Sequence, residues 1–555
     1  MESISKKLFL LEEKRKVFDL NSKLPLITEL LDINKNRLPD DCALVEIEPE
    51  KNSRREITWN QFGSLSEKIS ASLLKRGIKK GDCVVHLMMN SLEWLPVYFA
   101  ILKSGALAVP VNFRFMAKTI RNCIKLVEAK AVFFDETFTE RVNKIHSELK
   151  DLDIIYIFTG PESLMPEYCI HLSDLINDDA DTDALNSISL DSKDDAAMYF
   201  TSGTTGDPKA VLLTHDNLAF ACEVEQKHHG QTKDDVFLCI PPLYHTGAKM
   251  HWFGSLKTGG KAVILKGTKP KHIIKAVAQE SVSIVWLLVP WAHDILVAVE
   301  NNEIDVKDYD LSSWRLMHMG AQPVPESLVR KWEAVFPHHE YDTNYGLTEA
   351  SGPGCVHLGM INLEKIGAVG IPGYGWEYNI VYRNMQPVPV GEPGELIVRG
   401  RGVMKEYYKN REATEKTIVD GWLRTGDIAR VDKDGFIWLL DRKKDVIITG
   451  GENIFPAEIE DYILSHPKVH DVAVIGTPDK RLGELVTAVV QPKKGNDISE
   501  EEMIDFCCEL PRYRRPRIVH FEYVPRNPTG KIEKPELRKK FTGIYSSFKR
   551  DFNDY

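Results

Sequence analysis

The stretch YFTSGTTGDPKAVLLTH, residues 199–215, places six Ser, Thr and Gly residues between two apolar runs. Gly203 and Gly206 let the backbone turn sharply, so that hydroxyl and amide N–H groups can converge on one anion. Lys209 adds a positive charge beside this loop. Taken alone, such a loop is more often a solvated turn, but the anion that best fits its donors is a polyphosphate.

The spacing of this stretch disfavours two common classes of nucleotide-binding protein. A P-loop requires G-x-x-x-x-G-K-[ST] at the start of a helix, and a Rossmann enzyme requires G-x-G-x-x-G after a strand. Neither pattern occurs in the chain. If this stretch binds a polyphosphate, it does so as a loop between two strands, which is neither a P-loop nor a Rossmann loop.

Outward from this stretch, short β-rich runs alternate with helical ones, which predicts an α/β fold with largely parallel sheets. The β-rich runs DCVVHLMM, ALAVPV and KAVFFD alternate with the helical runs NSLEWLPVYFAILKSG and AKTIRNCIKLVEA. We expect Asn90 or Ser91 to cap the first helix, with Glu93 in its first turn, and Gly105 to end it. A second series includes AVILKG, VSIVWLLVP and WRLMHMGAQPVP.

The residue pattern changes after Tyr374. Short Gly-rich β-runs there predict a small β-subdomain of hairpins. The charged run DRKKD, residues 441–445, then precedes a final segment with its own strands and helices. The predicted fold is α/β: a large N-terminal domain of parallel-rich sheets with helices, and a small, mobile α+β C-terminal domain. We place these domains at residues 1–441 and 446–555, with a hinge at 442–445.

Composition bounds the class of protein. The 555 residues are 43% hydrophobic and 27% charged, with a formal net charge of −10, which indicates a globular protein and argues against a nucleic acid partner. Nine cysteines without a C-x-x-C pair favour reduced thiols in a cytoplasmic protein. The first twenty residues do not form a signal peptide, and we expect a docked helix there rather than a membrane-surface helix. No internal run predicts a transmembrane segment.

Six further motifs follow in order along the chain: PPLYHT at 241–246, MGAQPVP at 319–325, NYGLTE at 344–349, GWLRTGD at 421–427, DRKKDVIITGGENIFPAEIE at 441–460 and VPRNPTGKI at 524–532. Together with the opening stretch they resemble the adenylate-forming superfamily, which contains the acyl-CoA synthetases. The resemblance implies ATP-dependent activation of a carboxylic acid to an acyl-adenylate, with release of pyrophosphate. Transfer to coenzyme A then gives an acyl-CoA and AMP, and the implied cofactors are ATP, Mg²⁺ and coenzyme A.

The resemblance also implies roles for individual residues. Lys531, Glu349, Thr201 and His245 are the expected catalytic residues, and Thr201 and Glu349 the expected magnesium-associated pair. Glu349 would otherwise be a surface or capping residue, and Lys531 a solvated side chain. The residues expected to bind the nucleotide are Thr201, Ser202, Gly203, Thr204, Thr205, Gly206, Lys209, Gly320, Ala321, Gln322, Asn344, Tyr345, Gly346, Thr348, Glu349, Asp427, Arg442 and Lys531.

Three smaller sets complete the implied site. The acyl group is expected to contact His245, Trp286, Gly320 and Leu347, although a His after Tyr is more often structural. Coenzyme A is expected at Gly450, Gly451 and Glu452, and Lys444 is the expected hinge residue. The polar residues Lys249 and His251 and the bulky Trp286 and Trp291 favour a compact or polar-tailed acid over a very long chain.

Other readings stay open at this stage. An adenylating enzyme with a carrier-protein or other acceptor would share the first half-reaction, and a non-catalytic nucleotide-binding relative would share the fold. Retention of Lys531, Glu349, Asp427 and Thr201 together argues against the second alternative. The sequence leaves open whether the protein is a homodimer. The arginines at 512, 514, 515 and 517 could bind the phosphates of coenzyme A or form a solvated basic face.

Overall fold

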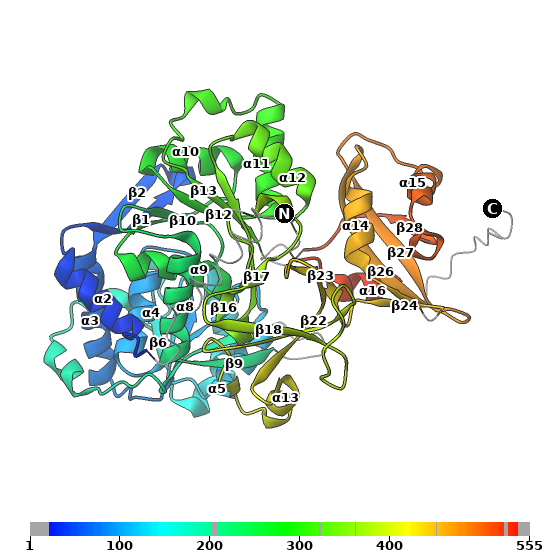
Figure 1. The fold of residues 1–555 in the computed structure, drawn as a ribbon. Helices are drawn as coiled ribbons and strands as arrows, with labels where there is room; N and C mark the ends of the chain where they lie inside the picture. Colours follow the sequence, from blue (N-terminus) through cyan, green and yellow to red (C-terminus); the bar gives the residue numbers. More distant parts are fainter. Residues whose placement is uncertain are drawn as a thin grey trace. The chain divides into compact units, whose positions relative to one another are not determined.

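The computed structural model describes residues 22–201, 208–320, 324–360, 362–450, 452–526 and 531–541 (Figure 1). Residue contacts divide the chain into two compact units. Unit 1 comprises Met1–Gly320, Glu326–Tyr378 and Val398–Leu423, and unit 2 comprises Ala321–Pro325, Asn379–Ile397 and Arg424–Tyr555. The α/β class and the large unit followed by a smaller one confirm the predicted fold class.

Unit 1 contains an eight-stranded sheet of order β20-β9-β8-β4-β3-β5-β6-β7. The run from β4 to β7 and the β4–β8 pair are parallel, whereas β8, β9 and β20 pair antiparallel. The strands are β3 (Cys83–Leu87), β4 (Leu107–Pro110), β5 (Ala131–Phe134), β6 (Ile155–Phe158), β7 (Ile170–His171), β8 (Asp195–Thr201), β9 (Lys209–Thr214) and β20 (Glu406–Tyr407).

A second sheet of unit 1 has seven strands in the order β14-β13-β12-β10-β11-β1-β2. All neighbours are parallel except the edge pair of β1 and β2. The strands are β1 (Cys42–Glu48), β2 (Ser53–Thr58), β10 (Val236–Cys239), β11 (Lys261–Leu265), β12 (Ile284–Leu288), β13 (Leu316–Gly320) and β14 (Glu340–Asp342).

The helices of unit 1 pack on these sheets and on one another, with α3 against α4 and α8 against α9. In α5 the buried residues Ile120, Cys123, Ile124 and Val127 recur at helical spacing and join the core formed by β3–β6. The helices are α2 (Ile27–Arg37), α3 (Trp59–Lys75), α4 (Trp94–Lys103), α5 (Ala117–Val127), α6 (Thr139–His146), α7 (Leu172–Ile176), α8 (His215–His229), α9 (Thr246–Thr258), α10 (Pro270–Glu280), α11 (Val289–Glu300), α12 (Glu326–Val335) and α13 (Arg411–Thr417).

The predicted cap of α4 is wrong. The helix begins at Trp94, and Glu93 stands at the capping position without a side-chain cap bond. The Asn90 side chain instead donates to the Pro241 carbonyl (3.0 Å) and accepts from the Leu243 N–H (2.8 Å). A long-range contact therefore overrides the local capping preference and holds the segment that carries PPLYHT. Gly105 follows the last helical turn at φ +76°, as predicted.

The Gly-rich region forms two antiparallel sheets. The strands β15 (Asn344–Leu347), β16 (Gly352–His357) and β17 (Ile371–Pro372) make one sheet. The other has the order β18-β19-β22-β21, with β23 paired to β22. In β22 buried and more exposed residues alternate, as a strand with one covered face requires. The strands of this second sheet are β18 (Trp376–Val381), β19 (Gly394–Gly400), β21 (Ile418–Val419), β22 (Trp422–Val431) and β23 (Ile437–Arg442).

The C-terminal part of unit 2 contains a sheet of order β25-β24-β27-β26, with β28 parallel to β27. Its core joins this sheet to α14 and α15, and α16 covers a smaller cluster that includes Ala473 and Val489. The elements are β24 (Ile447–Thr449), β25 (Glu452–Ile454), β26 (Val469–Asp479), β27 (Gly483–Pro492), β28 (Ile518–Phe521), α14 (Pro456–Leu464), α15 (Glu500–Phe506) and α16 (Lys534–Phe541).

All nine cysteines are free thiols, and seven of them are buried. None of the described helices is both long and apolar enough to cross a bilayer.

Candidate active site

Three of the predicted site segments follow the carboxyl ends of parallel strands in the seven-stranded sheet, and the predicted residue Trp286 lies within a fourth strand, β12. Residues 241–246 come after β10, the segment that begins at residue 321 comes after β13, and residues 344–349 come after β14. Because β10, β12, β13 and β14 are consecutive and parallel, these segments emerge at one edge of the sheet. The carboxyl edge of an open α/β sheet is where ligands bind in such folds.

The opening loop connects β8 to β9 in the eight-stranded sheet. Thr201, the last residue of β8, lies directly opposite Lys209, the first residue of β9. The antiparallel pair thus holds both flanks of the loop together. Residues 202–207, and with them Ser202, Gly203, Thr204, Thr205 and Gly206, lie outside the described residues, as do Ala321, Gln322 and Gly451.

Tyr407 joins the flank of this loop to Glu349. Its hydroxyl lies 2.8 Å from Glu349 Oε1, and Lys209 Nζ lies 4.6 Å from the centroid of its ring. β20 pairs Tyr407 with Val211 of β9. Burial, and then the Glu349 carboxylate, raise the pKa of Tyr407, so the phenol donates to the carboxylate. Glu349, which is far in sequence from Thr201 and Lys209, therefore lies close to them in space.

Tyr407 was not predicted as a site residue. It lies in the run KEYYKN, which carries no recognisable motif. Only the pairing of β20 with β9 gives it a place beside Lys209.

Glu349 has the chemistry that a magnesium site requires. It lies in a single 3₁₀ turn directly after β15, is half-buried, and its carboxylate lies beside the phenol of Tyr407. Hard oxygen donors of this kind, completed by phosphate and water oxygens, are the ligands Mg²⁺ prefers. The residue therefore fits the predicted magnesium-associated role.

Three of the predicted acyl-group residues, His245, Trp286 and Gly320, lie close together, with Trp286 in the centre. A Cβ added at Gly247 would lie 3.0 Å from the Trp286 ring and 3.1 Å from His245 Nδ1. A Cβ added at Gly320 would lie 3.3 Å from Trp286 Nε1. His245 caps α9, because its Nδ1 accepts from the Gly247 N–H at 3.1 Å. This histidine therefore has a structural contact as the cap of α9, and it lies beside Trp286.

The motif NYGLTE forms β15 and the turn after it. Thr348 Oγ1 lies 3.4 Å from Thr246 Oγ1, which brings the turn to the first residue of α9. Tyr345 is 9% exposed and is paired with Val356 on β16, and Asn344 is the first residue of the strand. Gly346 and Leu347 continue the same strand toward Thr348.

The two polar residues noted near the acyl segment are buried. Lys249 Nζ lies 4.0 Å from the ring centroids of both Tyr98 and Tyr199 and has no hydrogen-bond partner among the described residues. Burial holds the pKa of Lys249 well below its usual range. His251 is held by Glu225, with Nδ1 3.0 Å from Oε2. Both side chains are therefore structural members of the interior.

In unit 2, Asp427 and Arg442 face each other across β22 and β23. Arg442 Nε lies 2.8 Å from Asp427 Oδ1, and Asp427 is 5% exposed. Two residues predicted to contact the same ribose are therefore adjacent. Lys444 is exposed in the turn that follows β23, next to the buried Asp445.

Lys531 is exposed, immediately before the bridge that pairs Ile532 with Arg526. Lys534, three residues later, is buried and lies 2.9 Å from Glu460 Oε1 and 3.9 Å from Asp441 Oδ2. Burial raises the pKa of Asp441 to about 6, although Lys534 acts in the opposite direction. Lys534, which was not predicted, anchors the segment that presents Lys531.

The predicted coenzyme A residues lie at a hairpin. β24 and β25 pair antiparallel, with Thr449 opposite Glu452. Gly450 adopts φ +58°, and its N–H donates to the Leu482 carbonyl at 2.8 Å. The left-handed backbone favours glycine there. In the basic segment, Arg514 pairs with Glu458 at 2.6 Å, which gives at least this arginine a structural partner.

The fold, the residues around Glu349 and the residues around Asp427 suit one class of protein. This class is the enzymes that activate a carboxylate with a nucleotide held at the carboxyl edge of parallel strands. A family model described as "AMP-binding enzyme" matches residues 31–408, and one described as "AMP-binding enzyme C-terminal domain" matches residues 458–531. The chain belongs to this family of adenylate-forming enzymes, within its acyl-CoA synthetases.

Known relatives are acid–CoA ligases. A feruloyl-CoA synthase from Amycolatopsis sp is 32% identical, covering 87% of this chain and 94% of the relative. The long-chain-fatty-acid–CoA ligase FadD13 from Mycobacterium tuberculosis is 31% identical, covering 89% and 95%. The O-succinylbenzoate coenzyme A synthetase MenE from Bacillus subtilis, solved with ATP and magnesium ion, aligns with TM-score 0.77 and 26% identity, covering 92% and 98%.

The protein is therefore an AMP-forming carboxylate–CoA ligase. It converts a carboxylic acid and ATP to an acyl-adenylate and pyrophosphate, and then forms an acyl-CoA and AMP. ATP and coenzyme A are its substrates, and Mg²⁺ is its cofactor. The readings with another acceptor or without catalysis are not favoured.

Proposed function

We propose that the residues gathered at the carboxyl edge of the seven-stranded sheet bind ATP and a compact or polar-tailed carboxylic acid. The observation that carries this proposal is that three predicted segments and Trp286 belong to neighbouring parallel strands or follow directly after them. Trp286 fills space beside Gly247 and Gly320, which favours a short acyl slot. The relatives differ in the acids that their names give, so identity alone does not choose between compact and long acids.

The first half-reaction needs alignment more than proton transfer. A carboxylic acid has a pKa near 4, so the nucleophile is already an anion at neutral pH. The protein must bring this anion to the α-phosphate and absorb the charge that develops there. We assign the phosphates to the loop 201–206 and Lys209, and adenine to Tyr345 and the segment 320–322. We assign the ribose hydroxyls of ATP to Asp427 and Arg442.

Glu349 and Thr201 would hold Mg²⁺ with the phosphates of ATP. The ion would supply neutralisation of phosphate charge. Tyr407 holds Glu349 in place through its hydroxyl (2.8 Å), and Lys209 lies on the other side of the same ring. These residues thus place one carboxylate and one ammonium group beside the loop that we assign to the phosphates.

Lys531 would stabilise the charge that appears in the transition state of adenylation. We propose a hinge at Lys444, between an N-terminal domain, 1–441, and a C-terminal domain, 446–555, with Gly450, Gly451 and Glu452 at the coenzyme A thiol. A cytoplasmic location is part of the proposal, because the cysteines are unpaired and seven are buried. A homodimer is also part of the proposal.

The substrate proposal is tested by pyrophosphate release from a graded set of acids. The set runs from acetate to palmitate and includes benzoate, hydroxybenzoates, cinnamates and dicarboxylates, each with and without coenzyme A. We expect the highest kcat/KM for a compact or polar-tailed acid. A maximum at palmitate would refute the compact slot.

Lys531→Ala tests the division between the half-reactions. By analogy with deletion of a single transition-state donor, it should slow adenylate formation by about 10²–10³, or about 3–4 kcal/mol. Thioester formation from supplied acyl-adenylate should stay near the rate of the unmodified enzyme. Lys539→Ala, which removes a lysine from α16, is the control, and equal loss in both half-reactions would contradict the assignment.

A further inference from the structure

A cluster of imidazoles and carboxylates lies in the interior of unit 1, apart from the residues assigned to ATP. His229, His318 and Asp342 are each 0% exposed. They come from three elements, since His229 ends α8, His318 lies in β13 and Asp342 ends β14. His357 of β16, His251 of α9 and Glu225 of α8 surround them. The proposed substrate roles use none of these six side chains.

The three central ligand atoms form a nearly equilateral triangle. His229 Nε2 lies 3.2 Å from His318 Nδ1 and 3.4 Å from Asp342 Oδ2, and His318 Nδ1 lies 3.6 Å from Asp342 Oδ2. Zinc–nitrogen and zinc–oxygen bonds of about 2.0–2.2 Å separate the ligands of a tetrahedral ion by about 3.3–3.6 Å. The triangle therefore has the dimensions of one face of such a coordination shell.

A fourth ligand is available at the same place. His357 Nε2 lies 2.5 Å from Asp342 Oδ2, and His229, Asp342 and His357 each offer a ligand atom within 4.8 Å of the others. A second such group in the described part of the chain is His229, His251 and His318. To bind the same ion as Asp342, His357 Nε2 has to move about 1 Å away from Asp342 Oδ2. The two atoms then have the separation of tetrahedral ligands.

The groups around the triangle orient its ligands, as second-shell partners do at metal sites. Glu225 Oε2 lies 3.4 Å from His229 Nδ1, so a carboxylate faces the nitrogen opposite the ligating one. The backbone N–H groups of Thr343 (2.7 Å) and Gly359 (3.0 Å) donate to Asp342 Oδ1, which leaves Oδ2 for the cluster.

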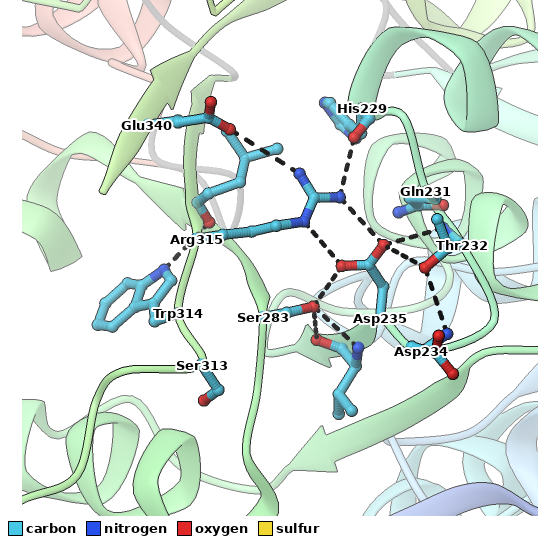
Figure 2. Close-up of polar contacts among 12 residues, drawn as sticks. His229, Gln231, Thr232, Asp234, Asp235, Ser283, Ser313, Trp314, Arg315 and Glu340 are labelled. Carbon is cyan, nitrogen blue, oxygen red and sulfur yellow. Dashed lines mark hydrogen bonds and ion pairs between the residues drawn. The ribbon is translucent and has the colours of Figure 1, made fainter. Parts of the chain in front are cut away.

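The backbone at His229 is also fixed. Figure 2 shows Arg315 reaching the His229 carbonyl while two of its nitrogens meet the Asp235 carboxylate. The distances are 2.9 Å to the carbonyl, and 2.8 and 3.1 Å to the carboxylate oxygens. Ser283 donates to the same carboxylate at 2.7 Å, so the end of α8 is tied to β12. Such a support holds His229 at a constant position relative to His318.

We propose that His229, His318 and Asp342, with His357 as the fourth ligand, bind one zinc-class divalent ion. Imidazole and carboxylate ligands in a tetrahedral arrangement suit Zn²⁺ better than Mg²⁺, which prefers six oxygen ligands. The ion is structural. His318 lies two residues before Gly320, and Asp342 two residues before Asn344, so it fixes the strand ends from which the ATP and acyl segments emerge.

The test measures metal in the full-length, tag-free protein without ATP or Mg²⁺. After incubation with Zn²⁺ and dialysis, elemental analysis should find about one equivalent of zinc. Titration with Co²⁺ should give the intense visible d–d absorption of a tetrahedral site. X-ray absorption of the zinc-loaded protein should show only nitrogen and oxygen ligands. Substoichiometric zinc and no tetrahedral cobalt spectrum would overturn the proposal and leave a hydrogen-bonded cluster.

Matched variants locate the site. His318→Gln and Asp342→Asn should weaken zinc binding at least about 10-fold. His215→Gln, which alters an equally buried histidine fourteen residues before His229 in α8, should bind like the unmodified protein. Unchanged binding in the first two variants would overturn the assignment. If these two variants do not fold, X-ray absorption of the unmodified protein still decides. Sulfur ligands on the zinc would overturn the assignment, because the nine free cysteines are the competing ligands.

Discussion

At the scale of single residues, the candidate active site depends on side chains that hold other side chains. Tyr407 is the clearest example, because its hydroxyl bonds Glu349 and its ring faces Lys209. The phenol bonds one oxygen of the carboxylate, so a group from β20 fixes the position of Glu349.

Tyr407→Phe removes this hydroxyl and keeps the ring. A hydrogen bond to a charged group contributes about 1.5–3 kcal/mol, so adenylation with Mg²⁺–ATP should slow roughly 10- to 100-fold. Thioester formation from supplied acyl-adenylate should be unchanged. Pyrophosphate release under single-turnover conditions measures the first half-reaction.

Tyr408→Phe is the matched control, since it alters the adjacent tyrosine, which packs against the core formed by β3–β6. Equal rates for Tyr407→Phe and the unmodified enzyme would show that the contact with Glu349 has no catalytic importance.

At the scale of elements, parallel strands explain why distant segments form one site. A parallel strand ends at the same edge as its neighbours, so the loops after β10, β12, β13 and β14 must meet. Side chains within these strands limit the space for the acyl group. Trp286 in β12 is opposite His318 in β13 and faces the two glycines at 247 and 320.

Trp286→Leu should enlarge the slot for the acyl group. One methylene in an apolar pocket is worth about 1–3 kcal/mol, so the ratio of kcat/KM for a longer acid to that for a compact acid should rise at least about 10-fold. Steady-state rates with an acid series measure this ratio. The KM for ATP should stay the same.

Trp332→Leu is the control at this scale, because Trp332 is buried on α12, packs against Trp314 and Phe336, and has no assigned role toward the acid. A similar change of acid preference in both variants would indicate a general loosening of the structure, and would contradict a specific role for Trp286.

At the scale of the whole molecule, the chain divides its assigned residues between two units. Thr201, Lys209 and Glu349 belong to unit 1, whereas Asp427, Arg442 and Lys531 belong to unit 2. Each unit has its own hydrophobic core. The proposed hinge at Lys444 lies within unit 2, between Arg442 and Lys531, so it would move the C-terminal part of that unit relative to Arg442.

Lys444→Pro tests this proposal, because proline fixes φ and restricts the preceding residue. If a rotation at this residue separates the half-reactions, one of them should slow by about 10²-fold, the cost of a misplaced catalytic group, while the other is retained. Lys444→Ala removes the charge without restricting the backbone and should affect neither half strongly. Equal slowing of both halves by Lys444→Pro would exclude the hinge.

The sequence alone determined the fold class, the order of the motifs and the class of reaction. The fold class follows from local patterns, such as apolar runs for buried parallel strands, whereas the class of reaction follows from the resemblance of the ordered motifs to the adenylate-forming superfamily. The Gly105 helix end was also predicted, because φ +76° is a local property of glycine.

Only the tertiary structure decided which side chains support the site. Asn90 was predicted as a helix cap, but it bonds residues about 150 positions away, which no local pattern encodes. Tyr407, Lys534 and the cluster of His229, His318 and Asp342 lack a motif because their partners come from distant strands and helices. Sequence periodicity reports the face on which a residue lies, whereas the neighbour it meets there depends on strand order and register.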